Sequence, residues 1–268
     1  MNYLVITGDH PRHLYYLNSI ADYCNLVGAV IEKRESFVPA PPDDLNKKDH
    51  DNYLKHFRNR EKYELEYFGE KKKLPACPIS YFEDSKLSED KVINFIKQKK
   101  VDIVFIFGVL DFTRRIKDRI SDNIILINLN TGLIQRYNGD ATLFWPFYFL
   151  EPNWVGATFH VLDNNLDTNN IIHQSVPLLK KGDTIHKVAS KVLLQATKDA
   201  KIIIDYLENN NSALPIVKKD SGKIFFSNEF RPEHLRVIYN LFDDNLVDFY
   251  LNNEIFPTEP NLIRLNNE

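Results

Sequence analysis

The chain has 268 residues, of which 43% are apolar, and its formal net charge is −3 at pH 7. This length suits one large domain or a domain with an appendage. The mixed charges argue against nucleic acid as a partner, and no apolar run reaches the ~20 residues of a membrane span. Cys24 and Cys77 have no metal-ligand spacing, so we expect no metal site and a reducing compartment, the cytoplasm.

The chain opens with a buried strand over residues 3–7, a glycine turn, and a periodic apolar run over residues 14–23. Strand, glycine turn and helix are the opening of a Rossmann-like unit, which the strand expected over residues 26–31 continues. The turn lacks the full G-x-G-x-x-G pattern, so we do not predict a dinucleotide site.

The first turn carries Gly8, His10, Arg12 and His13. Backbone N–H groups at a helix N-terminus attract phosphate, and Arg12 and His13 would add to that attraction. These residues are candidates for an anionic part of a substrate, with a plain turn as the alternative. A metal site at His10 and His13 lacks a third ligand nearby.

Residues 40–70 interrupt the α/β pattern with a charged stretch that carries an apolar stripe at helical spacing. We interpret this stretch as an amphipathic helical insertion whose stripe packs on the body of the protein or on a partner. The elements expected after it are strands over 78–81, 101–107, 124–127, 155–162 and 171–178, and helices over 88–100, 111–120 and 184–207, with Asp183 as the cap of the last helix.

This alternation predicts an α/β fold with a mostly parallel sheet and antiparallel additions after residue 150. We expect a main domain over residues 1–208. Residues 209–268 form a small C-terminal α/β appendage, with a strand over 222–226 and one or two helices over 232–251. The appendage is too small for an independent core, so it packs on the main domain or on a second subunit of a homodimer.

Asn128 and Asn130 stand at the end of the strand over 124–127, two residues apart. An extended chain sends both carboxamides to one side, at the sheet edge where α/β proteins build their sites. A loop with Arg136 and Tyr137 follows. The segment Gly-Ala-Thr-Phe-His ending at His160 and the segment around Asp167 come next.

These segments resemble the folate-dependent formyltransferases, a family that includes methionyl-tRNA, glycinamide ribonucleotide and sugar N-formyltransferases. The family motif is Asn-x-His, a loop with an Arg/Tyr-x-Gly element, and a G-x-T-x-H strand followed by Asp-x-Gly. The resemblance is specific over residues 101–180 and looser over the first thirty residues. Asn128 falls on the family Asn and Asp167 on the family Asp, whereas Asn130 stands where the family has its catalytic His.

The resemblance implies a formyltransferase that takes its formyl group from N10-formyltetrahydrofolate and delivers it to an amine. The absence of a long basic C-terminal barrel favours a nucleotide-linked amino sugar as acceptor over a tRNA. In the family the Asn donates to the formyl oxygen and the Asp tunes the His. Here Asn128 would donate, Asn130 could also donate, and Asp167 would accept a proton. His160 is a candidate replacement for the missing His, with a structural histidine as the alternative.

The resemblance also assigns the turn of Phe107, Gly108, Val109 and Leu110 to the folate, because the family has a similar turn there. Gly108 would let a flat ring approach the backbone. Arg136 and Tyr137 lie in the loop that borders the acceptor pocket in the family. Two other functions stay open: acyl transfer from an acyl-coenzyme A on the same fold, and a silent protein that binds the ligands without turnover.

Overall fold

The computed structural model describes residues 1–33, 38–70, 73–83, 86–120, 123–162, 170–210 and 213–265. Its main sheet has eight strands in the order β3-β2-β1-β4-β5-β7-β8-β9. The strands are β1 Tyr3–Gly8, β2 Leu26–Glu32, β3 Ile79–Phe82, β4 Ile103–Phe107, β5 Ile125–Asn130, β6 Tyr137–Gly139, β7 Ala157–Val161, β8 Asn170–Ser175, β9 Val217–Lys218 and β10 Lys223–Phe225.

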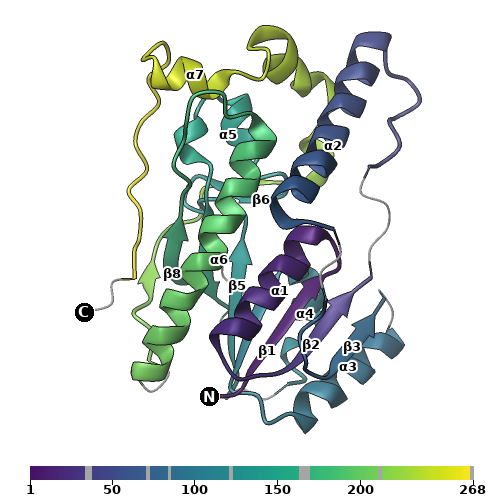
Figure 1. The fold of residues 1–268 in the computed structure, drawn as a ribbon, viewed down its shortest axis with the longest axis vertical. Helices are drawn as coiled ribbons and strands as arrows, with labels where there is room; N and C mark the ends of the chain where they lie inside the picture. The colour runs from purple at the N-terminus through teal and green to yellow at the C-terminus, as the bar shows by residue number, and fades with distance from the viewer. Residues whose placement is uncertain are drawn as a thin grey trace.

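The helices α1 to α6 come between strands in chain order, and α7 follows the last strand (Figure 1). The α-helices are α1 Pro11–Tyr23, α2 Lys47–Phe68, α3 Lys86–Gln98, α4 Leu110–Lys117, α5 Trp145–Tyr148, α6 Ile185–Asn209 and α7 Leu246–Leu251. Shorter turns are η1 Pro152–Trp154, η2 Ser227–Glu229, η3 Pro232–His234 and the π-helical turn η4 Val237–Leu241. Among the described residues, no helix combines the length and the apolar character needed to cross a membrane.

Strands β1 to β5 pair in parallel, and β7, β8 and β9 are antiparallel to their neighbours. Parallel pairing follows from the helices that connect these strands, because parallel neighbours need a crossover connection. The prediction of a mostly parallel sheet with antiparallel additions after residue 150 is confirmed. Up to residue 209 the expected strands and helices are present with small shifts of their ends, and the strand expected over 222–226 is β10. The short segments η3, η4 and α7 replace the one or two helices expected over 232–251. The strands β6 and β9 were not expected.

The sheet separates two apolar cores because neighbouring side chains of a strand face opposite ways. Tyr3 and Val5 of β1 belong to one core, together with buried residues of α1, α2 and α6. Leu4 and Ile6 belong to the other, which α3 and α4 cover. Buried strands of this kind are near-continuous apolar runs, so they were visible in the sequence.

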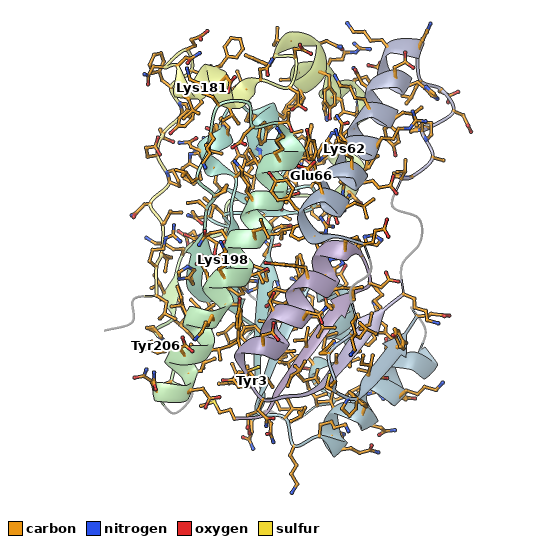
Figure 2. All side chains as sticks on the ribbon, viewed as in Figure 1. Tyr3, Lys62, Glu66, Lys181, Lys198 and Tyr206 are labelled. Atoms are coloured by element: carbon orange, nitrogen blue, oxygen red, sulfur yellow. The ribbon has the colours of Figure 1, made fainter. Side chains whose placement is uncertain are left out.

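The insertion forms the helix α2, which packs against α1 and α6. Its apolar and buried stripe faces the body, while Lys62 and Glu66 extend from its exposed side (Figure 2). The packing of the stripe on the body was one of the two interpretations of this segment.

Residues 213–265 are joined to the rest of the chain by strand pairing and by burial. β9 pairs with β8 on the main sheet, and β10 pairs in parallel with β6 in a separate two-stranded sheet. Gly139 of β6 has a φ of +85°, and a Cβ there would lie 2.2 Å from the carbonyl oxygen of Phe225, so a glycine permits this pairing. Phe225, Leu235 and Ile238 are members of the same apolar core as α1 and α6.

Candidate active site

A cleft of about 860 Å³ lies at the carboxyl ends of β1, β4 and β5. The chain leaves β1 towards β2 and leaves β4 towards β5, on opposite sides, so the cleft occupies the topological switch point of the sheet. It brings together most of the expected site residues, namely Arg12, His13, Phe107, Gly108, Val109, Leu110, Asn128 and Asn130.

Asn128 is buried at the floor of the cleft and faces His160 on the neighbouring antiparallel strand. Nδ2 of Asn128 lies 2.9 Å from Nε2 of His160. Because a carboxamide nitrogen donates, the assigned tautomer has Nε2 as acceptor and Nδ1 as the protonated nitrogen. The same carboxamide has a second N–H, which can donate to an oxygen atom in the cleft.

His160 is fully buried, and this burial lowers the pKa of its imidazole to about 4, with the charge of Arg114 acting in the same direction. The imidazole is therefore neutral around pH 7. A neutral His160 can hold Asn128 in place, and it does not line the cleft itself. This placement supports the structural alternative for His160 over direct contact with a substrate.

Asn130 points into the cleft beside Asn138, a residue of β6. Its Nδ2 donates to Oδ1 of Asn138 over 3.4 Å, and Nδ2 of Asn138 donates to Oγ of Ser221 over 2.8 Å. Oδ1 of Asn138 also accepts from the backbone N–H of Gly139. These bonds fix the orientation of Asn138, which in turn aligns the carboxamide of Asn130.

Gly108 and His13 also line the cleft, next to the carboxyl end of β4. Gly108 has a φ of +77°, and a Cβ at this position would lie 2.7 Å from Nε2 of His13. The His13 ring packs edge-on against Phe107, with ring centroids 4.6 Å apart. A side chain larger than hydrogen at residue 108 would therefore push His13 out of its place.

Arg12 lines the cleft from the first turn of α1, and it forms an ion pair with Glu64 of α2 at 3.3 Å. His10 is the N-cap residue of α1, and Gly8 ends β1. Neither of these two residues lines the cleft. Of the four turn residues, only Arg12 and His13 are thus placed to meet a ligand there.

Arg136 and Tyr137 do not line the cleft. Arg136 donates to both carboxylate oxygens of Glu151, and the Tyr137 hydroxyl donates to the same carboxylate. The Arg136 guanidinium also lies over the ring of Trp154, 4.8 Å from its centroid. The structure gives both residues a local role in holding the loop to the segment around Glu151.

Several cleft residues had not been identified from the sequence. Ser221, Ile224 and Phe226 reach the cleft from the region of β10, and Arg114 reaches it from α4. Both Ile224 and Phe226 are exposed, at 49% and 62%. Their alternation along a short strand was visible, but nothing local in the sequence connects that strand to β5.

Asp167 lies outside the described residues. Within the described residues, no group of three or more His, Cys, Asp or Glu side chains could hold a metal ion.

No protein-family model matches the sequence, and no curated protein matches it either. The fold does match solved structures. Phosphoribosylglycinamide formyltransferase from Anaplasma phagocytophilum aligns with a TM-score of 0.51 and 14% identity over 85% of this chain and 98% of its own.

Two further formyltransferases are similar to about the same degree. An N-formyltransferase from Helicobacter canadensis, solved with folinic acid and dTDP-3-aminofucose, has a TM-score of 0.50 and 17% identity over 94% of this chain and 82% of its own. A sugar 3-N-formyltransferase solved with dTDP and 5-N-formyltetrahydrofolate has the same score and identity over 94% and 81%. The expected formyltransferase fold is therefore confirmed.

Proposed function

We propose that the chain transfers a formyl group from N10-formyltetrahydrofolate to the amino group of a nucleotide-linked amino sugar. The observation that carries this proposal is the position of Asn128. It is a buried carboxamide, held by a neutral histidine at the floor of a switch-point cleft, on a fold that formyltransferases share. Two of these formyltransferases were solved with a folate and with a nucleotide or nucleotide-sugar.

The residues of the cleft suit the two substrates. Val109, Leu110, Ile224 and Phe226 give an apolar rim for the flat ring of the folate, next to the bare backbone of Gly108. Arg12 and His13 stand on the acceptor side, where an anionic group would meet the first turn of α1. Cys24 and Cys77 are free thiols, which suits a reaction in the cytoplasm.

In the transfer, the acceptor nitrogen forms a bond to the formyl carbon and the bond from that carbon to N10 of the folate breaks. Asn128 and Asn130 donate N–H groups to the formyl oxygen, which becomes negatively charged on the way. The proton lost by the amine passes to Asp167, directly or through water, and a proton is returned to N10. Asn130 cannot carry that proton, because a carboxamide does not ionise at neutral pH.

The test is turnover with N10-formyltetrahydrofolate and a panel of nucleotide-linked amino sugars, followed by mass spectrometry of the formylated product. Asn128→Ala should lower kcat by about 10²- to 10³-fold, the usual loss for one oxyanion donor. Asp167→Asn should abolish transfer. Full activity in both variants would remove the catalytic assignment.

The silent binding protein is kept as a second candidate because Asn130 replaces the family histidine. Calorimetry with a non-reacting formyl-folate separates the two candidates, since a silent protein binds the folate without turnover. An acyl-coenzyme A offered in place of the folate tests the remaining alternative, which is acyl transfer on the same fold. Product formed only from the coenzyme A donor would replace the proposed reaction with acyl transfer.

A further inference from the structure

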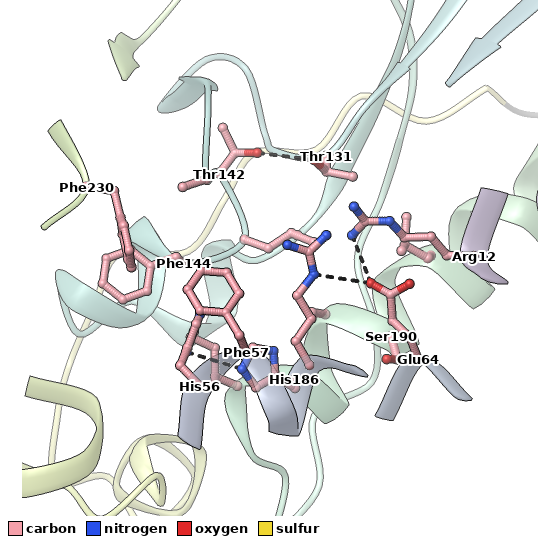
Figure 3. Close-up of a pocket in the computed structure, with 16 residues that line it drawn as sticks. Arg12, His56, Phe57, Glu64, Thr131, Thr142, Phe144, His186, Ser190 and Phe230 are labelled. Carbon is pink, nitrogen blue, oxygen red and sulfur yellow. Dashed lines mark hydrogen bonds and ion pairs between the residues drawn. The ribbon is translucent and has the colours of Figure 1, made fainter. Parts of the chain in front are cut away.

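Three arginines line the described cleft, and the charges of two of them are balanced by carboxylates inside the protein. Arg12 forms its ion pair with Glu64 of α2, whose side chain is buried (Figure 3). Arg115 of α4 donates from Nε to Glu89 over 2.9 Å, and the Glu89 side chain is only 15% exposed. The third arginine is Arg114, which is held differently.

Arg114 has a weak ion pair and a buried donor. Its guanidinium lies 3.4 Å from the carboxylate of Asp111, one turn earlier on α4, and the Asp111 side chain is 88% exposed. Ion pairs with a carboxylate in water contribute little, because water competes for the charges. Nε of Arg114 is buried, and no hydrogen-bond partner for this atom lies among the residues that the structure describes. The guanidinium therefore retains charge and a donor for a group in the cleft.

Arg114 and the carboxamide of Asn128 lie on the same side of the sheet. Leu126 of β5 belongs to the core that α4 covers. Side chains two residues apart in a strand share a face, so Asn128 points the same way as Leu126. Burial and, after it, the charge of Arg114 lower the pKa of His160, whose ring bonds to Asn128. The charge of Arg114 thus acts at the hydrogen-bonded pair on the floor of the cleft.

The proposed transfer develops a negative charge that the two asparagines meet only with neutral groups. The formyl oxygen becomes negative as the acceptor nitrogen bonds to the formyl carbon, and Asn128 and Asn130 donate uncharged N–H groups to it. A hydrogen bond from a charged donor is about twice as strong as one between neutral groups. A guanidinium is always protonated in proteins, so it can balance an oxyanion without taking the proton of the amine.

We propose that Arg114 is a further catalytic residue, which contacts the formyl oxygen held by Asn128 and balances its negative charge during transfer. This role rests on the proposed formyl transfer, and it leaves the bonds made and broken in that reaction unchanged. The proton of the amine still passes to Asp167. Because the formyl oxygen is uncharged in the bound substrate, the contact with Arg114 strengthens in the transition state, and Arg114 acts on kcat more than on KM.

The experiment is steady-state transfer from N10-formyltetrahydrofolate to the best acceptor of the nucleotide-linked amino sugar panel. Arg114→Gln should lower kcat by about 10²-fold, the lower end of the usual loss for one oxyanion donor, because the guanidinium is partly exposed to water. The KM of each substrate should stay near the parental value.

Arg119→Gln is the matched control. Arg119 follows α4, pairs with Glu89 and Asp90, and does not line the cleft. The control removes the same charge and an ion pair of the same helix region, so it should keep the parental kcat.

Two further variants separate the charge of Arg114 from its packing. Arg114→Lys keeps a positive charge in another geometry and should retain more of the rate than Arg114→Gln. Arg114→Ala should regain rate when guanidinium chloride is added far below unfolding concentrations, whereas sodium chloride at the same ionic strength should give no gain. If Arg114→Gln fails to fold, the lysine variant and the rescue carry the test.

A parental kcat in Arg114→Gln, or a loss that neither lysine nor guanidinium restores, overturns this role of Arg114. A raised KM for the folate with a parental kcat also overturns it, because Arg114 would then bind a carboxylate of the donor. Both results leave the proposed function standing, since the parent turns over. A parent that forms no formylated product with any acceptor rejects the proposed function and the role of Arg114 together.

Discussion

At the scale of single residues, the two asparagines at the centre of the cleft, Asn128 and Asn130, have different hydrogen-bond partners. Asn128 is held by His160 across the strand pair β5–β7, and Asn130 is aligned by Asn138. The sequence placed both carboxamides at one strand end, because side chains two apart in a strand share a side. It could not show that Asn138 and Ser221 support Asn130, since these contacts depend on the pairing of β6 with β10.

Asn130→His should raise the rate of formyl transfer, because an imidazole can carry a proton where a carboxamide cannot. A positioned acid–base group contributes about 10²- to 10⁴-fold, and we expect a gain towards the lower end of that range. Steady-state turnover of the variant beside the parent measures it. Asn138 also faces the new ring, so Asn130→Gln, which adds bulk without a proton carrier, is the control.

A rate unchanged in Asn130→His, with folate binding intact, would show that residue 130 does not take part in proton transfer. A rate that falls equally in Asn130→His and Asn130→Gln would show that the pocket is shaped around the shorter carboxamide.

At the scale of elements, α6 shows where local sequence reasoning succeeds and where it fails. Its extent was close to expectation, because a long periodic run identifies a helix. Its cap was wrong. The N-cap residue is Thr184, whose side chain makes no capping bond, and Asp183 instead accepts from the N–H of Lys180 and pairs with Lys191. The N–H of Ile185 donates to Asp244, a residue from a distant part of the chain.

Asp244 should make the stability of the protein depend on pH. Burial raises the pKa of its carboxyl to about 6, against the opposing effect of the Ile185 hydrogen bond. Because the pKa of Asp244 is raised in the folded state, its contribution to the free energy of unfolding is fully present below the pKa of an unfolded Asp, about 4. That contribution is lost as pH rises through about 6. Asp244→Asn keeps an acceptor for Ile185 and has no charge to lose.

The free energy of unfolding of Asp244→Asn, measured with urea, should therefore rise relative to that of the parent by roughly 2 kcal/mol between about pH 4 and pH 7. Asp244→Ala lacks the acceptor and also has to adopt the φ of +57° found here. It should be less stable than the asparagine variant by about 1–2 kcal/mol. A difference between the parent and Asp244→Asn that does not change with pH would contradict the raised pKa.

At the scale of the whole molecule, two apolar cores and the switch-point cleft follow from the order of strands and helices, and that order was readable from the sequence. The packing of residues 213–265 was not readable in detail. The short segments η3, η4 and α7 replace the one or two helices expected over 232–251. Their stability comes from contacts with α2, α5 and η1 rather than from helix-forming sequence.

Buried neutral histidines should make the whole fold sensitive to acid. Burial lowers the pKa of His56 to about 3 and that of His160 to about 4. A depressed folded-state pKa means that stability is complete above about pH 6.5 and falls as pH drops towards the folded value. Over that range, each of these histidines should lower the free energy of unfolding by on the order of 1 kcal/mol for each pH unit of acidification.

The midpoint of urea unfolding should decrease between about pH 7 and pH 5. His160→Gln should reduce this dependence, because the glutamine has no ring nitrogen that could take up a proton. A pH dependence in His160→Gln equal to that of the parent would show that His160 is not buried in its neutral form.

The position of Ser221, Ile224 and Phe226 in the cleft has a consequence for biosynthesis. A ribosome delivers the chain from its N-terminus, so the nascent protein has β1, β4 and β5 long before these three residues exist. Throughout that interval the carboxamides of the cleft lack one wall, and β6 presents an edge that β10 later pairs. An unpaired edge of this kind invites association with other chains. Completion of the cleft and protection of that edge are thus achieved together, after translation has passed residue 226.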